Sequence, residues 1–331
     1  MNDVVLKVQD LHTYFYTGNR CNKVLRGISF EAKKGKTLCV VGESGCGKSV
    51  TASSIMQLLP DLARVESGEI LFYDDDKEIR LDKLPRNGKQ INEIRGGKIA
   101  MVFQDPMTAL NPVYKVGKQI AENLRQHTSM SRKEADAKAV ELLRDMGIPN
   151  PEQRAREYPH QFSGGMRQRA MIAMAMACEP KLLIADEPTT ALDVTIQAQI
   201  FALMDKLKKE RDTAVIMITH DMGVVAEMAD EVIVMYMGNV VERGTAQEIF
   251  NNPTHPYTVA LLNSIPVAGR GKNQKLKPIR GSTADPYNRP AGCQFAPRCD
   301  YCTEACQQTM PGETHLGGTH CVSCHHVGKE D

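Results

Sequence analysis

Residues 42–49 combine three glycines, a lysine and two serines at a spacing suited to binding an anion. They are Gly42, Glu43, Ser44, Gly45, Cys46, Gly47, Lys48 and Ser49. This run fits G-x-x-x-x-G-K-[ST] and follows the apolar residues 38–41. The glycines let the backbone turn its N–H groups inward, and the next helix adds the positive end of its dipole. The pattern predicts a phosphate-binding loop, with Lys48 reaching the β- and γ-phosphates and Ser49 ligating Mg²⁺.

Three other polar groups follow apolar strand candidates. Asp186 and Glu187 come after residues 182–185, Gln104 after 99–103 and His220 after 215–219. Ligands bind at the carboxyl ends of parallel strands, where Asp186 suits Mg²⁺ and Glu187 suits activation of a water molecule. Such residues are also common in turns, in exposed loops and, for histidine, in structural positions. The phosphate loop earlier in the chain favours the metal site.

A second anion site is predicted where small residues begin a helix. Ser163, Gly164 and Gly165 precede the helical pattern 167–178, although such a triplet is most often only a helix cap. Near the N-terminus, the aromatic run 14–16 offers a ring that stacks on a purine, or equally well fills one face of a strand.

The remaining pattern predicts an α/β scheme with inserted helices. Alternating apolar residues indicate strands at 4–8 and 24–30, and a further apolar strand lies at 232–235. A helix is expected over 50–59, ended by Pro60, and a longer helical stretch over 116–147. Gly238 and Asn239 predict a hairpin turn, and residues 267–277 have the composition of a linker.

Composition narrows the possible partners. The 331 residues carry 41 Lys and Arg against 40 Asp and Glu, so the chain lacks the basic excess that drives nucleic-acid binding. The longest apolar stretch, 170–178, is about half of the ~18 residues that a spanning helix needs, and no signal-peptide pattern opens the chain. A cytoplasmic protein is expected, with any membrane role coming through a partner.

Taken together, these motifs closely resemble those of the ATP-binding subunits of ABC transporters. The resemblance covers about residues 1–250 and places the family's motifs in their usual order. It identifies 42–49 as the Walker A loop, Gln104 as the Q-loop and 163–165 as the signature. It also identifies 182–187 as Walker B with its glutamate, 191–193 as the D-loop and His220 as the switch histidine. It implies a P-loop NTPase of the ABC cassette type, with a RecA-like core, an antiparallel β subdomain and a helical insertion. The implied domains are 1–104 with 159–252, then 105–158, and a C-terminal extension at 253–331.

The resemblance also implies the site. Catalytic roles fall to Glu187, His220 and Gln104, and Mg²⁺ is held through Ser49, Gln104 and Asp186. ATP contacts come from the Walker A loop, from Ser163, Gly164, Gly165 and Asp193 of a partner protomer paired head to tail, and from Phe15, which stacks on adenine with Tyr14 and Tyr16 as alternatives.

Two segments narrow the resemblance to the D-type ATPases of bacterial dipeptide and oligopeptide importers: 162–169, and 252–258 with the pairs 261–262 and 265–266 beyond it. The implied function is ATP hydrolysis that drives peptide import. The implied partners are a second ATPase (F-type, or a second copy of the chain), two permease subunits and an external peptide-binding protein, at the cytoplasmic face of the bacterial inner membrane. Nickel and glutathione importers, soluble ABC proteins, and a redox switch regulated by ATP are the alternatives.

Six of ten cysteines crowd between 293 and 324. Their spacing includes C-x₂-C-x₁₈-C-x₂-C, which indicates zinc. The resemblance instead implies a [4Fe–4S] cluster on Cys293, Cys299, Cys306 and Cys324, and this cluster is preferred over Zn²⁺ or metal-free thiols. The extension is therefore expected to be a small metal-binding segment with little core of its own.

Overall fold

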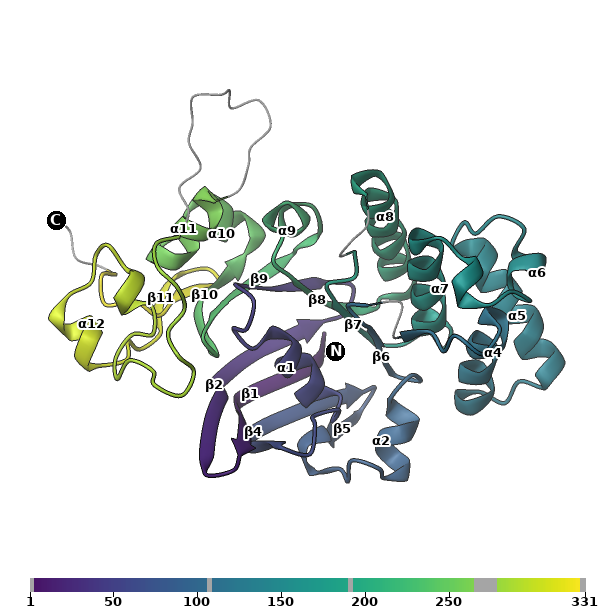
Figure 1. Cartoon of the computed structure of the whole chain (residues 1–331), viewed down its shortest axis with the longest axis horizontal. Helices are drawn as coiled ribbons and strands as arrows, with labels where there is room; N and C mark the ends of the chain where they lie inside the picture. The colour runs from purple at the N-terminus through teal and green to yellow at the C-terminus, as the bar shows by residue number, and fades with distance from the viewer. Residues whose placement is uncertain (1–2, 106–108, 190–192, 265–278, 328–331) are drawn as a thin grey trace. The chain divides into compact units, whose positions relative to one another are not determined.

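The computed structural model describes residues 3–105, 109–189, 193–264 and 279–327. The chain forms two compact units (Figure 1). One unit comprises Met1–Leu6, Ala32–Lys36 and Tyr73–Met217, and the other comprises Lys7–Glu31, Thr37–Phe72 and Ile218–Asp331. We call them the helical unit and the loop unit, after the helices of the first and the phosphate loop of the second. Residues 191 and 192 of the predicted D-loop, residues 265 and 266, and the predicted linker lie outside the described residues.

The helical unit contains the neighbouring strands β8, β7 and β6, of which β8 Ala214–Thr219 begins in this unit. Strands β6 Ile99–Val102 and β7 Leu182–Asp186 are parallel, and Val102 is paired with Ala185. All five residues of β7 are buried, as its apolar sequence predicts. The short strand β5 Lys77–Arg80 and the 3₁₀ turn Leu81–Lys83 also belong to this unit.

Helices make up most of the helical unit. They are α2 Lys89–Ile94, α4 Val116–His127, α5 Arg132–Asp145, α6 Pro151–Arg154, α7 Gly164–Met176 and α8 Val194–Arg211, with a 3₁₀ turn at Pro159–Gln161. Helices α4, α5, α6 and α7 gather in one cluster (Figure 1). The predicted helical stretch 116–147 contains two helices, and the second begins after Ser131, which caps α5 with a reciprocal bond to Glu134.

In the loop unit one group of strands is hydrogen-bonded in the order β11-β12-β10-β9-β3. The bounds are β3 Thr37–Val41, β9 Glu231–Tyr236, β10 Asn239–Thr245, β11 Thr314–Gly317 and β12 His320–Val322. Strand β3 is parallel to β9, and the other neighbours are antiparallel. The hairpin turn between β9 and β10 is made by Met237 and Gly238, one residue earlier than predicted, and both have the positive φ (45° and 79°) that a tight hairpin turn favours.

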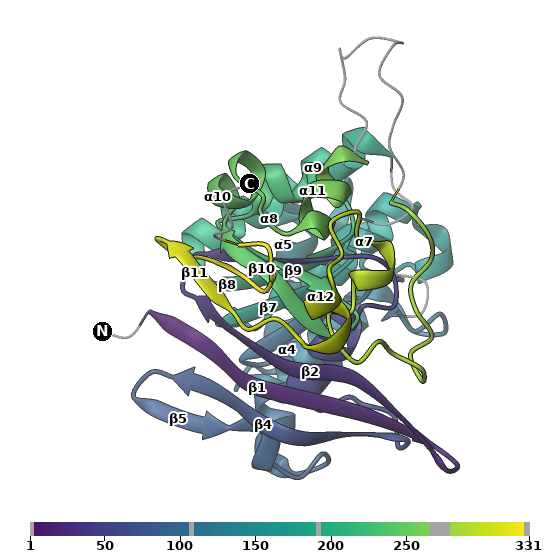
Figure 2. The ribbon, with the colours of Figure 1, turned by 90° about the vertical axis from the view of Figure 1, so that its left-hand side faces the viewer.

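A second group of strands, β2-β1-β4, lies side by side in this unit (Figure 2). They are β1 Val4–Thr17, β2 Arg20–Lys33 and β4 Ala63–Asp74, so the first two strands are longer than the predicted 4–8 and 24–30. The helices are α1 Lys48–Ile55, α9 Met222–Met228, α10 Ala246–Asn251, α11 Pro256–Asn263 and α12 Glu304–Gln308, with a 3₁₀ turn at Ala296–Arg298. Among the described residues, no helix is long and apolar enough to cross a membrane.

Candidate nucleotide-binding site

The predicted phosphate loop connects β3 to α1 in the loop unit. Gly42 and Gly47 have φ values of 150° and 109°. A Cβ atom on Gly42 would lie 2.2 Å from the backbone oxygen of Met235, and one on Gly47 would lie 2.7 Å from Cδ2 of Leu25. Both positions therefore require glycine for conformation and for space. Ser44, Gly45 and Ser49 are exposed.

Lys48 reaches back over its own loop. Its Nζ donates to the backbone oxygens of Gly42 at 2.7 Å and Glu43 at 3.1 Å, and the residue is only 6% exposed. The ammonium group is thus fixed against the loop that is expected to hold phosphates. Cys46, at 3.9 Å from the same nitrogen, is a buried thiol whose pKa is raised by that burial.

We expect Gly42→Ala to lower the melting temperature far more than Gly45→Ala. The Cβ atom added at Gly42 meets backbone, whereas Gly45 (φ 81°) has nothing within 4 Å of that position. The change at Gly45 carries only the left-handed backbone penalty of about 1–2 kcal/mol. Overpacking at Gly42 adds roughly 1–3 kcal/mol. Thermal unfolding without nucleotide measures both, and equal midpoints would contradict the loop geometry.

Two of the predicted catalytic residues meet in the helical unit. Because Val102 pairs with Ala185 in register, Gln104 and Glu187 follow the ends of neighbouring strands at the same level. Nε2 of Gln104 donates to Oε2 of Glu187 at 3.0 Å. Asp186, the last residue of β7, is 5% exposed. Parallel pairing therefore places an amide beside the acidic pair.

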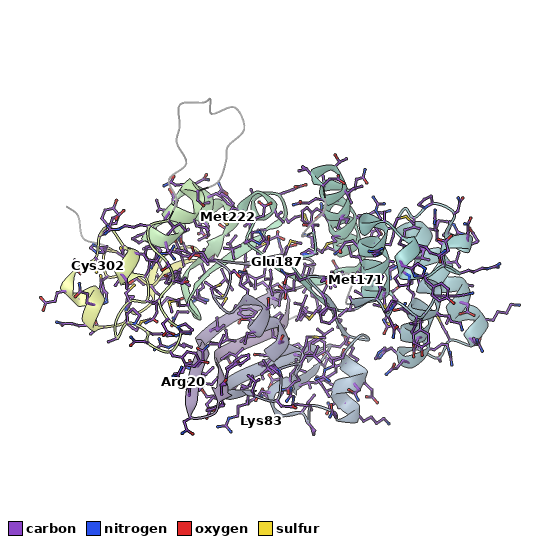
Figure 3. The ribbon with its side chains drawn as sticks, viewed as in Figure 1. Arg20, Lys83, Met171, Glu187, Met222 and Cys302 are labelled. Carbon is purple, nitrogen blue, oxygen red and sulfur yellow. The ribbon has the colours of Figure 1, made fainter. Side chains whose placement is uncertain are left out.

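Glu187, labelled in Figure 3, has an unusual backbone conformation. Its φ is 46°, in the left-handed region that residues other than glycine rarely adopt. Such strain costs of the order of 1–3 kcal/mol and gathers at functional sites. The turn after β7 and the bond from Gln104 together fix the direction of this carboxylate.

The signature and the D-loop aspartate lie at the starts of α7 and α8. Ser163 caps α7, its Oγ accepting from the Met166 N–H at 3.3 Å, and Asp193 caps α8 by accepting from the Ile196 N–H at 3.0 Å. A Cβ atom on Gly165 would lie 2.9 Å from Cγ2 of Ile196, so these two helix starts are in close contact. Both caps are satisfied within the chain, which agrees with the cap interpretation of Ser163 and leaves its ATP contact a prediction.

The structure gives less information on the predicted roles of two residues of the loop unit. His220 is exposed and lies between β8 and α9. Phe15 is half-buried, while its neighbours have other contacts: the Lys23 ammonium lies 5.4 Å from the Tyr14 ring, and Tyr16 donates to Glu66 at 2.7 Å. These contacts favour Phe15 over the two tyrosines, and its stacking role remains a prediction.

The predicted metal site of the C-terminal extension is wrong. Among the residues that the structure describes, no group of three or more His, Cys, Asp or Glu side chains is placed to hold a metal ion. The Sγ atom of Cys306 lies 3.3 Å from the Thr303 hydroxyl. Burial raises the pKa of Cys293, Cys299 and Cys324, that of Cys299 to about 11. The structure therefore gives no support for a [4Fe–4S] cluster or Zn²⁺ at these residues.

Protein contacts hold this extension in place of a metal. Strand β12 pairs with β10 along Glu242↔Val322 and Arg243↔Cys321. In the same strands, Nε2 of buried His320 lies 2.8 Å from Oε1 of buried Glu242. A segment with so few apolar residues was expected to need a metal. That expectation did not include this continuation of the sheet, which stabilises the segment (Figure 2).

Sequence reasoning also missed two residues that contact the phosphate loop and one that supports Arg298. Arg298 pairs with the Glu43 carboxylate, Tyr257 accepts the Glu43 N–H at 2.8 Å, and Tyr236 supports Arg298. Tyr257 lies in a segment that the resemblance used only as a subfamily marker, and Arg298 lies between Cys293 and Cys299 of the predicted cluster. A buried arginine demands an acidic partner, but spacing alone does not say which one.

Comparisons with known proteins agree with this arrangement. Residues 25–190 match the family model described as ABC transporter, and residues 241–306 match that described as oligopeptide/dipeptide transporter, C-terminal region. The chain is 50% identical over 321 residues to the dipeptide transport ATP-binding protein DppD of Bacillus subtilis, covering 97% of this chain and 94% of the relative. It is 50% identical over 319 residues to OppD, the oligopeptide transport ATP-binding protein of the same organism, covering 96% and 87%.

Solved structures confirm the cassette fold. A dimeric ATP-binding cassette in a post-hydrolysis state, bound to ADP and Pi, is 28% identical with a TM-score of 0.64, covering 73% of this chain and 98% of that one. The protein cbiO1 of Clostridium perfringens, part of an ABC transporter complex, is 30% identical with a TM-score of 0.63, covering 76% and 92%. The chain therefore belongs to the ATP-binding subunits of ABC transporters, in the group that carries the oligopeptide/dipeptide C-terminal region.

Proposed function

We propose that this chain binds and hydrolyses ATP to drive an importer of dipeptides or oligopeptides. The observation that carries the proposal is the joint match: a cassette with a complete phosphate loop, followed by the C-terminal region of oligopeptide/dipeptide transporters, at 50% identity to DppD. Several relatives at similar identity are named as peptide or oligopeptide transport ATP-binding proteins. This agreement favours peptides over nickel or glutathione as the substrate.

In the proposed reaction the loop unit supplies Lys48 to the phosphates and Ser49 to Mg²⁺. Asp186 and Gln104 complete the magnesium environment. Glu187 orients and deprotonates the attacking water, and the Gln104 amide that contacts its carboxylate at 3.0 Å keeps it directed. His220 donates to the γ-phosphate, and Phe15 stacks on the adenine.

The proposed active form is a head-to-tail pair of ATPase subunits. A solved relative is a dimeric cassette bound to ADP and Pi, which supports pairing of this kind. Ser163, Gly164, Gly165 and Asp193 of one protomer would then cover the nucleotide held by the other. The partner is a related F-type subunit or a second copy of this chain. Two permease subunits and an external peptide-binding protein complete the importer, with this chain at the cytoplasmic face of the inner membrane.

The proposed domains are 1–104 with 159–252 for the ATP-binding core, 105–158 for the helical subdomain and 253–331 for the extension. Helices α4 to α6, from Val116 to Arg154, fall within the second of these ranges. In the proposed assembly this subdomain and the region of Gln104 face the permeases. ATP-driven closure would thus be passed to the membrane subunits.

Peptide uptake tests the substrate class. In cells of the source organism that carry Glu187→Gln in place of the native chain, uptake of radiolabelled dialanine or tetraalanine is expected to fall to background. Cells that carry Glu179→Gln, a change at another left-handed glutamate, serve as the control and should take up peptide normally. Unchanged uptake of both peptides, with loss of ⁶³Ni²⁺ or glutathione uptake, would overturn the peptide assignment.

A further inference from the structure

The C-terminal extension reaches into the phosphate loop through Arg298. This residue ends the 3₁₀ turn Ala296–Arg298, and its side chain is 4% exposed. Nη1 donates to Oε2 of Glu43 at 2.6 Å and Nη2 to Oε1 at 3.0 Å. A bidentate guanidinium–carboxylate pair fixes both direction and distance. The extension and the loop that begins at Gly42 are therefore joined by a rigid charged contact.

The arginine itself is firmly held. Nε donates to the backbone oxygen of Arg280 at 2.8 Å, and Nη1 also donates to the hydroxyl of Tyr236 at 3.3 Å. Its guanidinium carbon lies 5.9 Å from the ring centre of Phe295. With each nitrogen engaged, the side chain has little freedom to leave Glu43.

An aromatic cluster anchors this part of the extension to the core strands. The ring of Phe295 lies 5.3 Å from that of Tyr236 on β9 and 5.4 Å from that of Tyr257 on α11, and the two tyrosine rings are 4.7 Å apart. The three residues are at most 3% exposed. The cluster makes Arg298 a fixed point rather than a mobile surface arginine.

A second contact restrains the backbone of Glu43. The hydroxyl oxygen of Tyr257 accepts the Glu43 N–H at 2.8 Å. Burial raises the pKa of Tyr257, so the hydroxyl stays protonated and neutral. This bond takes one N–H of the loop out of the set available to phosphate and fixes where the loop begins to turn.

The charge of Glu43 gives these contacts a consequence for nucleotide. A carboxylate in a triphosphate-binding loop repels the ligand, since both are negative. Pairing with Arg298 cancels that charge locally. Without the guanidinium, the loop would keep an uncompensated negative group close to Lys48, which binds the backbone oxygen of Glu43 at 3.1 Å.

We propose that Arg298 and Tyr257 of the C-terminal region are positioning residues for the phosphate loop, and that they set its affinity for MgATP by neutralising and orienting Glu43. This inference rests on the ATP binding proposed for residues 42–49. It gives the extension a role in nucleotide affinity.

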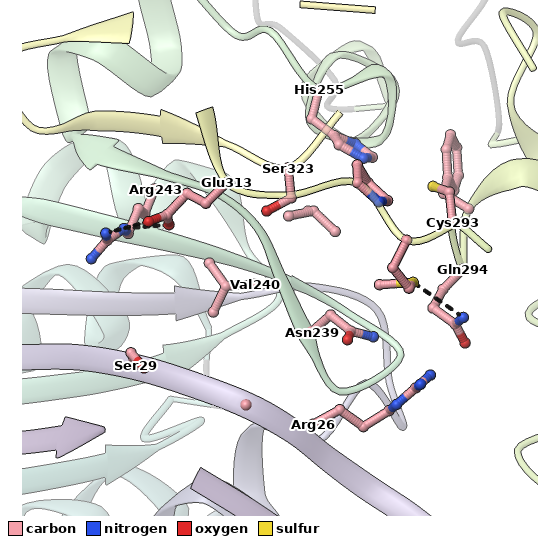
Figure 4. A pocket seen from close by; sticks show the side chains of 15 residues that line it. Arg26, Ser29, Asn239, Val240, Arg243, His255, Cys293, Gln294, Glu313 and Ser323 are labelled. Atoms are coloured by element: carbon pink, nitrogen blue, oxygen red, sulfur yellow. Dashed lines mark hydrogen bonds and ion pairs between the residues drawn. The ribbon is translucent and has the colours of Figure 1, made fainter. Parts of the chain in front are cut away.

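The test compares Arg298→Met with Arg243→Met in the full chain. Arg243 forms another bidentate pair between core and extension, at 2.9 and 2.8 Å to Glu313, and lines a cavity of about 320 Å³ that includes no residue of the phosphate loop (Figure 4). Calorimetry with MgATP on the Glu187→Gln background measures the dissociation constant without turnover. We expect Arg298→Met to raise it by at least about tenfold and Arg243→Met to leave it within about twofold.

A double variant separates this role from a merely structural one. If the uncompensated carboxylate weakens binding, Glu43→Gln added to Arg298→Met should recover most of the lost affinity, whereas a folding defect would persist. Turnover at saturating MgATP, measured with Glu187 intact, should change by less than about threefold in Arg298→Met because the positioning acts on binding. If Arg298→Met does not fold, Arg298→Gln also removes the charge and Tyr257→Phe removes the bond to the Glu43 N–H, and both should raise the dissociation constant.

The outcomes are distinct. If the parent protein itself binds no MgATP, the proposed function fails. The positioning role is overturned, and the ATPase assignment stands, if the parent binds MgATP and Arg298→Met binds it equally well. The same holds if the substitutes Arg298→Gln and Tyr257→Phe bind equally well, or if Glu43→Gln gives no recovery.

Discussion

Glu187→Gln is expected to bind MgATP with nearly unchanged affinity and to lose at least about 100-fold in turnover, the scale of a lost general base. The amide oxygen of glutamine can still accept from Nε2 of Gln104, which contacts the carboxylate at 3.0 Å, so the local geometry survives. What disappears is the ability to take a proton from water. Phosphate release under saturating MgATP, together with a binding isotherm, measures the two effects.

A matched control exists in the same unit. Glu179 also has a left-handed backbone, with φ 53°, and it forms an ion pair with Arg211. Glu179→Gln removes a carboxylate at a similarly strained position and should retain full turnover. Full turnover in Glu187→Gln, or loss of its MgATP binding, would remove Glu187 from the role of base.

The same variant tests the paired form of the enzyme. With hydrolysis blocked, MgATP should shift Glu187→Gln, together with its F-type partner if a single chain does not pair, to a dimer in size-exclusion chromatography. Gly165→Ala should oppose this shift, because its Cβ atom would lie 2.9 Å from Cγ2 of Ile196 and displace the start of α7. Nucleotide trapped on monomers alone would contradict a site shared between protomers.

Much of the site is readable from sequence because its chemistry depends on local spacing. Glycines at 42 and 47 are required by the backbone itself, and a strand leading to Asp186 places carboxylates at a sheet edge. The contact between Gln104 and Glu187 follows from parallel pairing of β6 with β7. Sequence therefore predicts these residues with no knowledge of distant contacts.

The contacts that the sequence did not predict depend on packing between residues far apart in the chain. Arg298 and Glu43 are 255 positions apart, and no periodicity connects them. The cysteine spacing predicted a metal because it ignores side-chain direction, burial and the pairing of β12 with β10 that stabilises the extension. The helix break before Ser131 depends on a reciprocal cap that a long run of helix-forming residues conceals.

The substrate class came from the family resemblance, because neither the spacing of residues nor the pairing of strands indicates it. Peptide as the substrate class came from the segments 162–169 and 252–258, and the match of residues 241–306 to the oligopeptide/dipeptide C-terminal region agrees with it. The resemblance was wrong where it implied a metal cluster, because the described residues contain no group of side chains placed to hold a metal ion. Family features thus transfer safely only where the local chemistry in this chain also fits.

Lys48→Met is expected to weaken MgATP binding by at least about 100-fold. A hydrogen bond to a charged group contributes roughly 1.5–3 kcal/mol, and the ammonium group is placed to reach two phosphates, so about 3–6 kcal/mol is lost. Its present partners, the backbone oxygens of Gly42 and Glu43 at 2.7 and 3.1 Å, hold Nζ at the loop. Isothermal calorimetry measures the change.

Lys48→Arg distinguishes charge from geometry. The lysine is 6% exposed, and the planar guanidinium is larger than an ammonium group and donates in fixed directions. The arginine variant should therefore lose most of the affinity although the charge is kept. Lys7→Met, which removes a half-exposed lysine paired with Glu31 at 3.1 Å, should bind MgATP normally. If Lys48→Met binds within about threefold of the parent chain, a difference of about 0.7 kcal/mol, this lysine does not hold the phosphates.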